Sequence, residues 1–172
     1  MIARQDLPQD ALLRKYRDMG AYTDCYATDI ATRVSYAEYV EAFYTTWVFK
    51  LERLLLKWLV ARPSTDDEAR RLSRGELDGF AAWTVEGRAP DQLLLADFMG
   101  RTKSWLMVAP LDTTRTRLYF GSAVVPVGGK AGRPRLGFNF SALLGFHKLY
   151  SRVLLAAAKS RLARHEQSPA IR

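Results

Sequence analysis

The stretch QLLLADFMGRTKSWLMVAPLDTTRTRLYFGSAVV, residues 92–125, decides the fold. It contains three runs of residues with high β-propensity: 92–98, 102–109 and 115–125. Short connections around Gly100 and Pro110 separate the runs. Connections this short join antiparallel neighbours, because a parallel connection needs a dozen or more residues. The stretch therefore predicts an antiparallel meander, which a further run at 80–86 extends by one strand.

Two N-caps upstream of the meander predict helices. Ser35 and Glu38 have the spacing of a capping box, in which each side chain binds a free backbone amide near the other residue. The helical pattern after this box continues to residue 61 in two pieces. Ser64 or Thr65 caps a shorter helix at 66–73, whose acids precede its arginines as the helix dipole favours. A strand at 22–30 precedes both caps, because its bulky side chains alternate with smaller ones.

The last predicted element is a long amphipathic helix that begins at Asn139 or Ser141 and runs to residue 163. Its apolar side chains recur at helical spacing and predict one stripe: Leu143, Phe146, Tyr150, Val153, Leu154 and Ala157. His147 lies at the margin of this stripe, and Lys148, Arg152 and Lys159 lie on the opposite side. We expect the stripe to close the main apolar core.

Strands and helices are segregated along the chain rather than alternating, which predicts an α+β fold. For 172 residues of which 48% are hydrophobic, we expect one domain that spans residues 1–172. The order of the elements predicts a curved antiparallel sheet, with a helix pair and a long C-terminal helix packed on its concave face.

This order resembles the helix-grip fold of the START/Bet v 1-like (SRPBCC) superfamily. Three segments look like those of a bacterial family within it: 43–53, 100–105 and 116–126. The superfamily usually has six strands after the helix pair, whereas this sequence predicts four, or five with an edge strand at 136–138. The resemblance implies a shell that encloses an apolar ligand such as a lipid. It brings no assigned catalytic residues to this chain.

Charge is distributed unevenly along the chain. Residues 1–125 contain equal numbers of acids and bases, so the formal net charge of +8 comes from residues 126–172, whose only acid is Glu166. A basic region favours an anionic partner or a solvated helix face. Its cations are too dispersed for a nucleic-acid-binding arm, and we expect no nucleic acid partner.

The chain shows neither a secretory signal at its start nor the ~20 apolar residues of a membrane span. Its single cysteine, Cys25, cannot form a disulfide within the chain. We therefore expect a cytoplasmic protein without a transmembrane segment.

Few side chains suggest chemistry. His147 is either a general acid/base that faces a cavity, with Asp97 or Arg101 as its partner, or a hydrogen-bonded histidine at the rim of the core. Cys25 has no neighbouring cation in its strand, which predicts a buried, inert thiol. Two histidines and one cysteine lack the spacing of a metal-ligand set. We expect no metal, no cofactor and no assigned catalytic residue.

A ligand site is expected between the C-terminal helix and the sheet. Its predicted members are Ser104, Phe120, Ser122, His147 and Tyr150. Ser104 is in phase with Leu106, and Ser122 is in phase with Phe120. The two hydroxyls are therefore expected as polar points on an apolar wall, an arrangement common in ligand pockets.

The charged residues of the meander determine which phase of each strand faces outward. Lys103 alternates with Trp105, and Arg117 with Tyr119, so both aromatic residues should lie on the outer face with these cations. Trp83 and Phe98 are expected to join them. An aromatic patch of this kind predicts either a homodimer through the outer face or a covering by the N-terminal segment.

These expectations favour a binder of a small apolar ligand or lipid over an enzyme. Two alternatives stay open: an interaction module whose core is filled by its own side chains, and a small enzyme on the same fold that uses His147. Polar side chains that point inward from several strands distinguish the three classes. A binder needs a few, an enzyme needs an acid/base set, and a filled module needs none.

Overall fold

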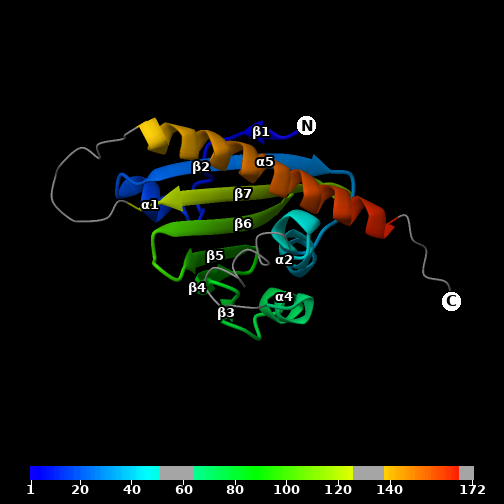
Figure 1. Ribbon diagram of the computed structural model, residues 1–172. Coiled ribbons are helices and arrows are strands. Elements are labelled where there is room, and N and C mark those ends of the chain that lie inside the picture. Colours follow the sequence, from blue (N-terminus) through cyan, green and yellow to red (C-terminus); the bar gives the residue numbers. More distant parts are fainter. Residues whose placement is uncertain (51–63, 126–137, 167–172) are drawn as a thin grey trace.

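The computed structural model describes residues 1–50, 64–125 and 138–166, without the side chains of 138–149, 165 and 166. The fold is α+β, with one antiparallel sheet in the strand order β1-β2-β7-β6-β5-β4-β3 (Figure 1). The strands are β1 Ala3–Arg4, β2 Tyr22–Ile30, β3 Gly79–Phe80, β4 Trp83–Ala89, β5 Gln92–Asp97, β6 Thr102–Pro110 and β7 Thr116–Val124. The helices are α1 Arg14–Asp18, α2 Tyr36–Tyr44, α4 Asp66–Ser73 and α5 Phe138–Glu166.

The predicted meander is confirmed, but its first strand is wrong. The run at 80–86 was expected to be continuous, whereas the structure has the short β3 before the turn and β4 after it. Ala81 adopts a φ of 53°, a conformation that interrupts an extended strand. The strand predicted at 22–30 is confirmed as β2, which pairs with β7 along its whole length.

Both predicted helix caps are confirmed. Ser35 Oγ accepts a hydrogen bond from the Glu38 amide at 3.3 Å, and Glu38 Oε2 accepts one from the Ser35 amide at 2.8 Å. Thr65 and Glu68 form the same reciprocal pair at the start of α4. Such boxes satisfy backbone amides that have no partner inside the helix, and they set where α2 and α4 begin.

The main core lies between the helices and one face of the sheet, which we call the inner face. Apolar side chains of β2, β5, β6 and β7 meet α2, α4 and α5 there. Aromatic rings from α2 and the sheet are in contact: the Phe43 and Phe120 centroids are 4.9 Å apart, and those of Tyr44 and Phe80 are 5.5 Å apart. α5 runs across this face (Figure 1).

The stripe predicted for α5 is partly wrong. Leu154 is buried as expected, and Tyr150 and Ala157 pack half-buried against the core, but Val153 is 37% exposed. The fully buried positions are instead Ser151, Leu155 and Ala158. Small side chains let a helix approach a sheet closely, and a pattern weighted by hydropathy undervalues them. The side chains of Leu143 and Phe146 lie outside the described residues.

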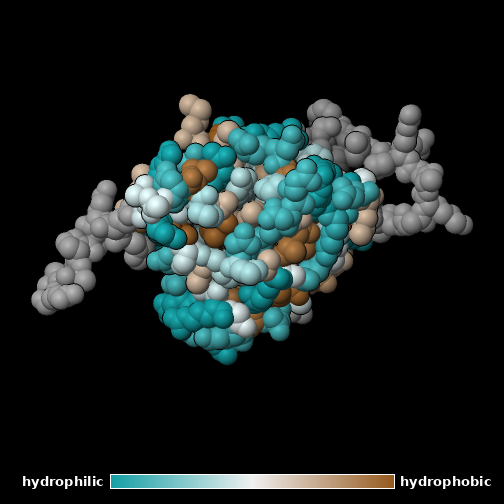
Figure 2. Space-filling view, turned by 180° about the vertical axis from the view of Figure 1, so that it is seen from behind, coloured by the Kyte–Doolittle hydropathy of each residue, from teal (hydrophilic) through white to brown (hydrophobic). Residues whose placement is uncertain are grey.

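The outer face of the sheet carries a second core, covered by the N-terminal segment, residues 7–16. The outward phase predicted for β6 and β7 is confirmed, since Trp105 and Met107 contact Leu7, Ala11 and Leu13 of this segment. Trp105 is fully buried within its own chain. Seen from behind, this side of the molecule is mostly hydrophilic, with small separate hydrophobic patches (Figure 2).

Gln92 and Glu86 fasten the N-terminal segment to the outer face. Gln92 Oε1 accepts hydrogen bonds from the Leu12 amide and from Trp105 Nε1, both at 2.9 Å. The Glu86 carboxylate binds Lys15 Nζ at 2.5 Å, Lys103 Nζ at 2.6 Å and the Tyr16 hydroxyl. The N-terminal segment therefore covers the aromatic outer face. This is one of the two alternatives that the sequence predicts, the other being a homodimer.

Trp83 does not join the outer aromatic residues. It pairs with Asp97 in the β4–β5 ladder, two positions from the inward-facing Leu95, and it packs against the main core. Phe98 lies in the β5–β6 turn and is exposed. Alternation places the β4 charges Glu86 and Arg88 on one phase, but the bulge between Val85 and Gly87 turns them to opposite faces. These charges therefore did not fix the phase of Trp83.

Candidate functional site

Three of the five predicted site residues lie together on the inner face. Ser104 of β6 is directly opposite Ser122 of β7, and Phe120 lies two positions further along β7. All three are buried. Tyr150 is half-buried in α5 and packs against the same core. The side chain of His147 lies outside the described residues.

Sequence reasoning missed Asp24, a buried carboxylate beside Ser122. The Asp24 side chain lies on the inner phase of β2, and the residue is only 3% exposed. Its Oδ1 accepts hydrogen bonds from Ser122 Oγ at 2.5 Å and from the Ser122 amide at 3.1 Å. Burying a carboxylate is costly unless it is bonded, so these bonds help to hold Asp24 inside. Alternation with the inward-facing Tyr26 is the sequence signal that could have placed Asp24 on the inner face.

Ser104 extends this arrangement toward the helices. Its hydroxyl lies 3.2 Å from the hydroxyl of Tyr44, which α2 places over the sheet. Asp24, Ser122, Ser104 and Tyr44 therefore form a line across β2, β7, β6 and α2, which we call the polar row. Apolar residues flank it: Tyr26, Phe43, Phe49, Leu106 and Phe120.

Tyr22 adds a further polar atom near the end of the row. It lies on the same phase of β2 as Asp24, and its hydroxyl is buried without a hydrogen-bond partner among the residues that the structure describes. Burial, and then the charge of Asp24, raise the pKa of Tyr22 and also that of Tyr26. Both phenols are therefore neutral donors at physiological pH.

Cys25 is buried, as predicted. Burial is the main cause that raises the pKa of its thiol to about 12, and the charges of Asp24 and Asp6 add to the effect. The thiolate is the reactive form of cysteine. A thiol with this pKa remains protonated at neutral pH, so the site supplies no cysteine nucleophile.

The acid and base proposed as partners of His147 have a local role. Asp97 Oδ1 accepts hydrogen bonds from the Arg101 amide at 2.6 Å and from the Thr102 amide at 3.0 Å. These bonds close the β5–β6 turn. Arg101 takes part through its backbone, and its side chain is exposed. The described residues thus give Asp97 and Arg101 a structural function in the turn.

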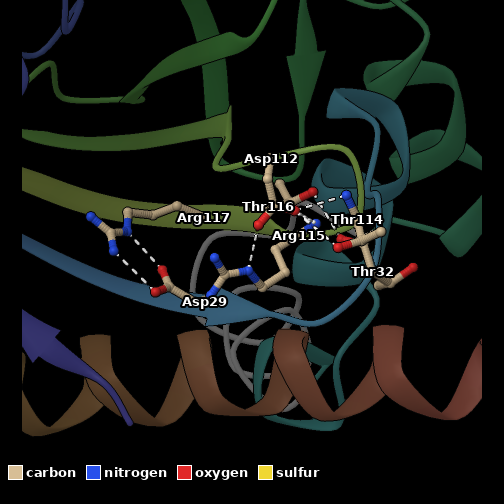
Figure 3. A network of polar contacts seen from close by, with 7 residues as sticks. All are labelled: Asp29, Thr32, Asp112, Thr114, Arg115, Thr116 and Arg117. Atoms are coloured by element: carbon tan, nitrogen blue, oxygen red, sulfur yellow. Dashed lines mark hydrogen bonds and ion pairs between the residues drawn. The ribbon is translucent and has the colours of Figure 1, made fainter.

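A charged network occupies the other end of the sheet (Figure 3). Arg117 donates to both carboxylate oxygens of Asp29, at 2.6 and 3.0 Å, and Asp112 accepts from Thr114 and Arg115 in the β6–β7 turn. Thr116 Oγ1 donates to the Thr32 carbonyl at 2.9 Å. Asp29 and Arg117 join β2 to β7, Thr116 holds the segment after β2, and Asp112 closes the β6–β7 turn. These groups are satisfied by one another rather than forming an open site.

A cleft of about 280 Å³ lies near this network, between α2 and α5. Its charged lining carries both signs: Arg33, Glu38, Glu41 and Arg161. Glu38 already closes the capping box of α2. The balanced lining gives no preference for a ligand of either charge, and the polar row is the better candidate.

No family model matches this chain, and neither the curated proteins nor the solved structures give a match. Within the described ranges, no three His, Cys, Asp or Glu side chains gather in a way that could hold a metal ion. No helix of the described residues is long and apolar enough to span a bilayer.

Proposed function

We propose that this protein binds a small, mainly apolar ligand between the inner face of the sheet and α5, and that the polar row orients one polar group of that ligand. The observation that carries the proposal is the row itself: a carboxylate and three hydroxyls that cross the centre of an otherwise apolar wall. A few convergent polar groups in an apolar surface are typical of ligand sites.

The topology supports placing the chain in the START/Bet v 1-like superfamily. The long β2 pairs with the last strand, β7, and the meander β3–β7 completes the sheet, while α5 crosses the same face as α2. This arrangement corresponds to the helix grip that the sequence resembles. A cytoplasmic setting is part of the proposal, because the single cysteine is a buried free thiol.

A second candidate, an interaction module with a filled core, is favoured by one observation. Members of the row bond to each other, Ser122 to Asp24 and Ser104 to Tyr44, so the fold satisfies these groups without a ligand. In that case the row would specify how β2, β6, β7 and α2 pack. The two candidates differ in whether a foreign molecule accompanies the protein.

Native mass spectrometry of gently purified protein tests the proposal. We expect the wild type to carry a co-purified mass, and we expect the Ser104→Ala/Ser122→Ala variant to lose most of it. Ser73→Ala is the matched control, since Ser73 is equally buried but lies in α4 and bonds to the Arg70 carbonyl. A wild type without any bound mass, or equal loss in the control, would favour the filled module.

A further inference from the structure

Three exposed hydrophobic side chains lie at one end of the sheet. Met19 is 73% exposed, and Phe98 and Met99 are each 53% exposed. Met19 precedes β2, and the other two residues form the turn between β5 and β6. β2 starts and β5 ends on the same side of the molecule (Figure 1), so we call these three residues the hydrophobic tip.

The tip is presented by well-defined turns. In the β5–β6 turn, Asp97 accepts three hydrogen bonds, from the Gly100, Arg101 and Thr102 amides, and Gly100 has a φ of 69°. Met19 is followed by Gly20, whose φ is 79° and whose amide bonds to the Arg17 carbonyl at 2.9 Å. The turns therefore present Phe98 and Met99 to water, an unfavourable exposure that points to an external contact.

Positive charge accompanies the tip. Arg101 lies two residues after Met99, is exposed, and makes no ion pair within the described part of the chain. Arg17 lies two residues before Met19 and pairs with Asp18 at 3.8 Å. The Val125 amide bonds to the Arg101 carbonyl at 2.8 Å, so the chain leaves β7 at this end.

We infer that the hydrophobic tip docks on the surface of an anionic lipid bilayer. Phe98 and Met99 enter the interface between headgroups and acyl chains, and Arg101 and Arg17 contact the lipid phosphates. Hydrophobic insertion combined with juxtaposed cations is the general basis of reversible binding to anionic membranes. The inference is independent of the proposed ligand, since it uses no residue of the polar row.

A bilayer fits this surface better than a second protein molecule does. The tip consists of separate side chains on two turns. A stable protein interface buries roughly 1,200–2,000 Å² and needs shape complementarity. A lipid surface requires neither, because a fluid interface adapts to isolated side chains, and its negative charge complements the arginines.

Co-sedimentation of the full-length protein with vesicles tests the inference. The vesicles contain equal parts of phosphatidylcholine and phosphatidylglycerol, with pure phosphatidylcholine as the uncharged comparison. We expect the wild type to bind the anionic vesicles more tightly, and Phe98→Ser/Met99→Ser to weaken that binding by at least about tenfold. The matched control is Leu111→Ser, an exposed leucine after β6, at the opposite end.

If urea denaturation shows that Phe98→Ser/Met99→Ser is unstable, a variant that changes only the charge at the tip tests the same inference. Arg101→Glu should weaken binding to anionic vesicles, whereas Arg164→Glu, which makes the same change in net charge at the far end of α5, should weaken it less. Three results would each overturn the inference. The first is a wild type that fails to bind the anionic vesicles, the second is an equal loss of vesicle binding in each variant and its control, and the third is a wild-type dimer that the tip variant dissociates.

Discussion

Gly121 lies where β7, the backbone of β2 and the outer core pack closely together. A Cβ at this position would lie 2.9 Å from the Asp24 carbonyl oxygen, from Leu13 Cδ2 and from Trp105 Cε3. Because one of these atoms belongs to the backbone of β2, the strand itself must shift. We expect Gly121→Ala to lower the free energy of unfolding by ~1–3 kcal/mol, as overpacking does.

Urea denaturation checks this prediction, with Gly79→Ala as the control. A Cβ at Gly79 would have no atom closer than 3.8 Å, and the glycine has no positive φ. The control should stay close to the wild type. A Gly121→Ala protein as stable as the wild type would mean that Trp105 and β2 move apart without cost.

Glu86 predicts an acid-sensitive contribution to stability. Burial alone would raise its pKa, but the hydrogen bonds from Lys103, Lys15 and Tyr16 together lower the pKa from 4.5 to about 2. A carboxyl group with a lowered pKa in the folded state stabilises the fold fully above its unfolded value, near 4.5, and this contribution disappears as the pH falls toward 2.

We therefore expect Glu86→Gln to be less stable than the wild type at pH 7, and the difference in urea midpoint to shrink between pH 4.5 and pH 2. Glu76→Gln, in an exposed ion pair with Arg71, is the control that should have little effect. A pH-independent difference for Glu86→Gln would show that its contribution is not electrostatic.

At the scale of elements, α5 gives a sharp test of which helix face is buried. Leu154 is almost fully buried, whereas its neighbour Val153 is 37% exposed. We expect Leu154→Ala to cost ~2–5 kcal/mol of unfolding free energy. Val153→Ala should cost less than about 0.5 kcal/mol, the usual range for surface substitutions. Urea denaturation of both variants measures the difference, and similar costs would mean that α5 is rotated on the sheet.

The elements that sequence predicted well are those with local physical signals. Capping boxes at Ser35 and Thr65 start their helices where expected, and the charges of Lys103 and Arg117 fix the outer face of β6 and β7. β1 and β3 were missed because a strand of two residues has no periodicity. The exposure of Val153 could not be anticipated, since the contact is set by the small Ser151 and Ala158.

The candidate site also contains residues that local sequence patterns predict and one residue that they do not. Ser104, Phe120 and Ser122 follow from strand alternation, and the structure places them together. Asp24 was missed because charged side chains ordinarily face water, and its partner Ser122 lies 98 positions away in the sequence. A pairing at such distance depends on the register between β2 and β7, which no local pattern encodes.

At the scale of the whole molecule, residues 7–16 cover the outer face of the sheet. Trp105, which motivated the expectation of a homodimer, is covered by Leu7, Ala11 and Leu13 of its own chain. A dimer through the outer face would have to contact this covering and the half-buried Tyr119 instead of the tryptophan. The apolar surface that would drive association is already buried.

The covering leads to a prediction about association. We expect the wild type to sediment as a 19.5 kDa monomer at micromolar concentrations. In Leu13→Asp, a carboxylate would replace a fully buried side chain, and its desolvation cost should detach the segment and expose Leu94, Trp105 and Met107. This variant should self-associate as its concentration rises. Leu111→Asp, a change at an exposed leucine, should remain monomeric.

Sedimentation velocity over a range of concentrations distinguishes the possible results. A dimeric wild type would show that the N-terminal segment does not replace a partner. A monomeric Leu13→Asp protein that retains its far-ultraviolet circular dichroism would show that the segment stays in place without Leu13. Gln92 and Glu86 would then suffice to fasten it, because their bonds to Leu12, Lys15 and Tyr16 do not involve the Leu13 side chain.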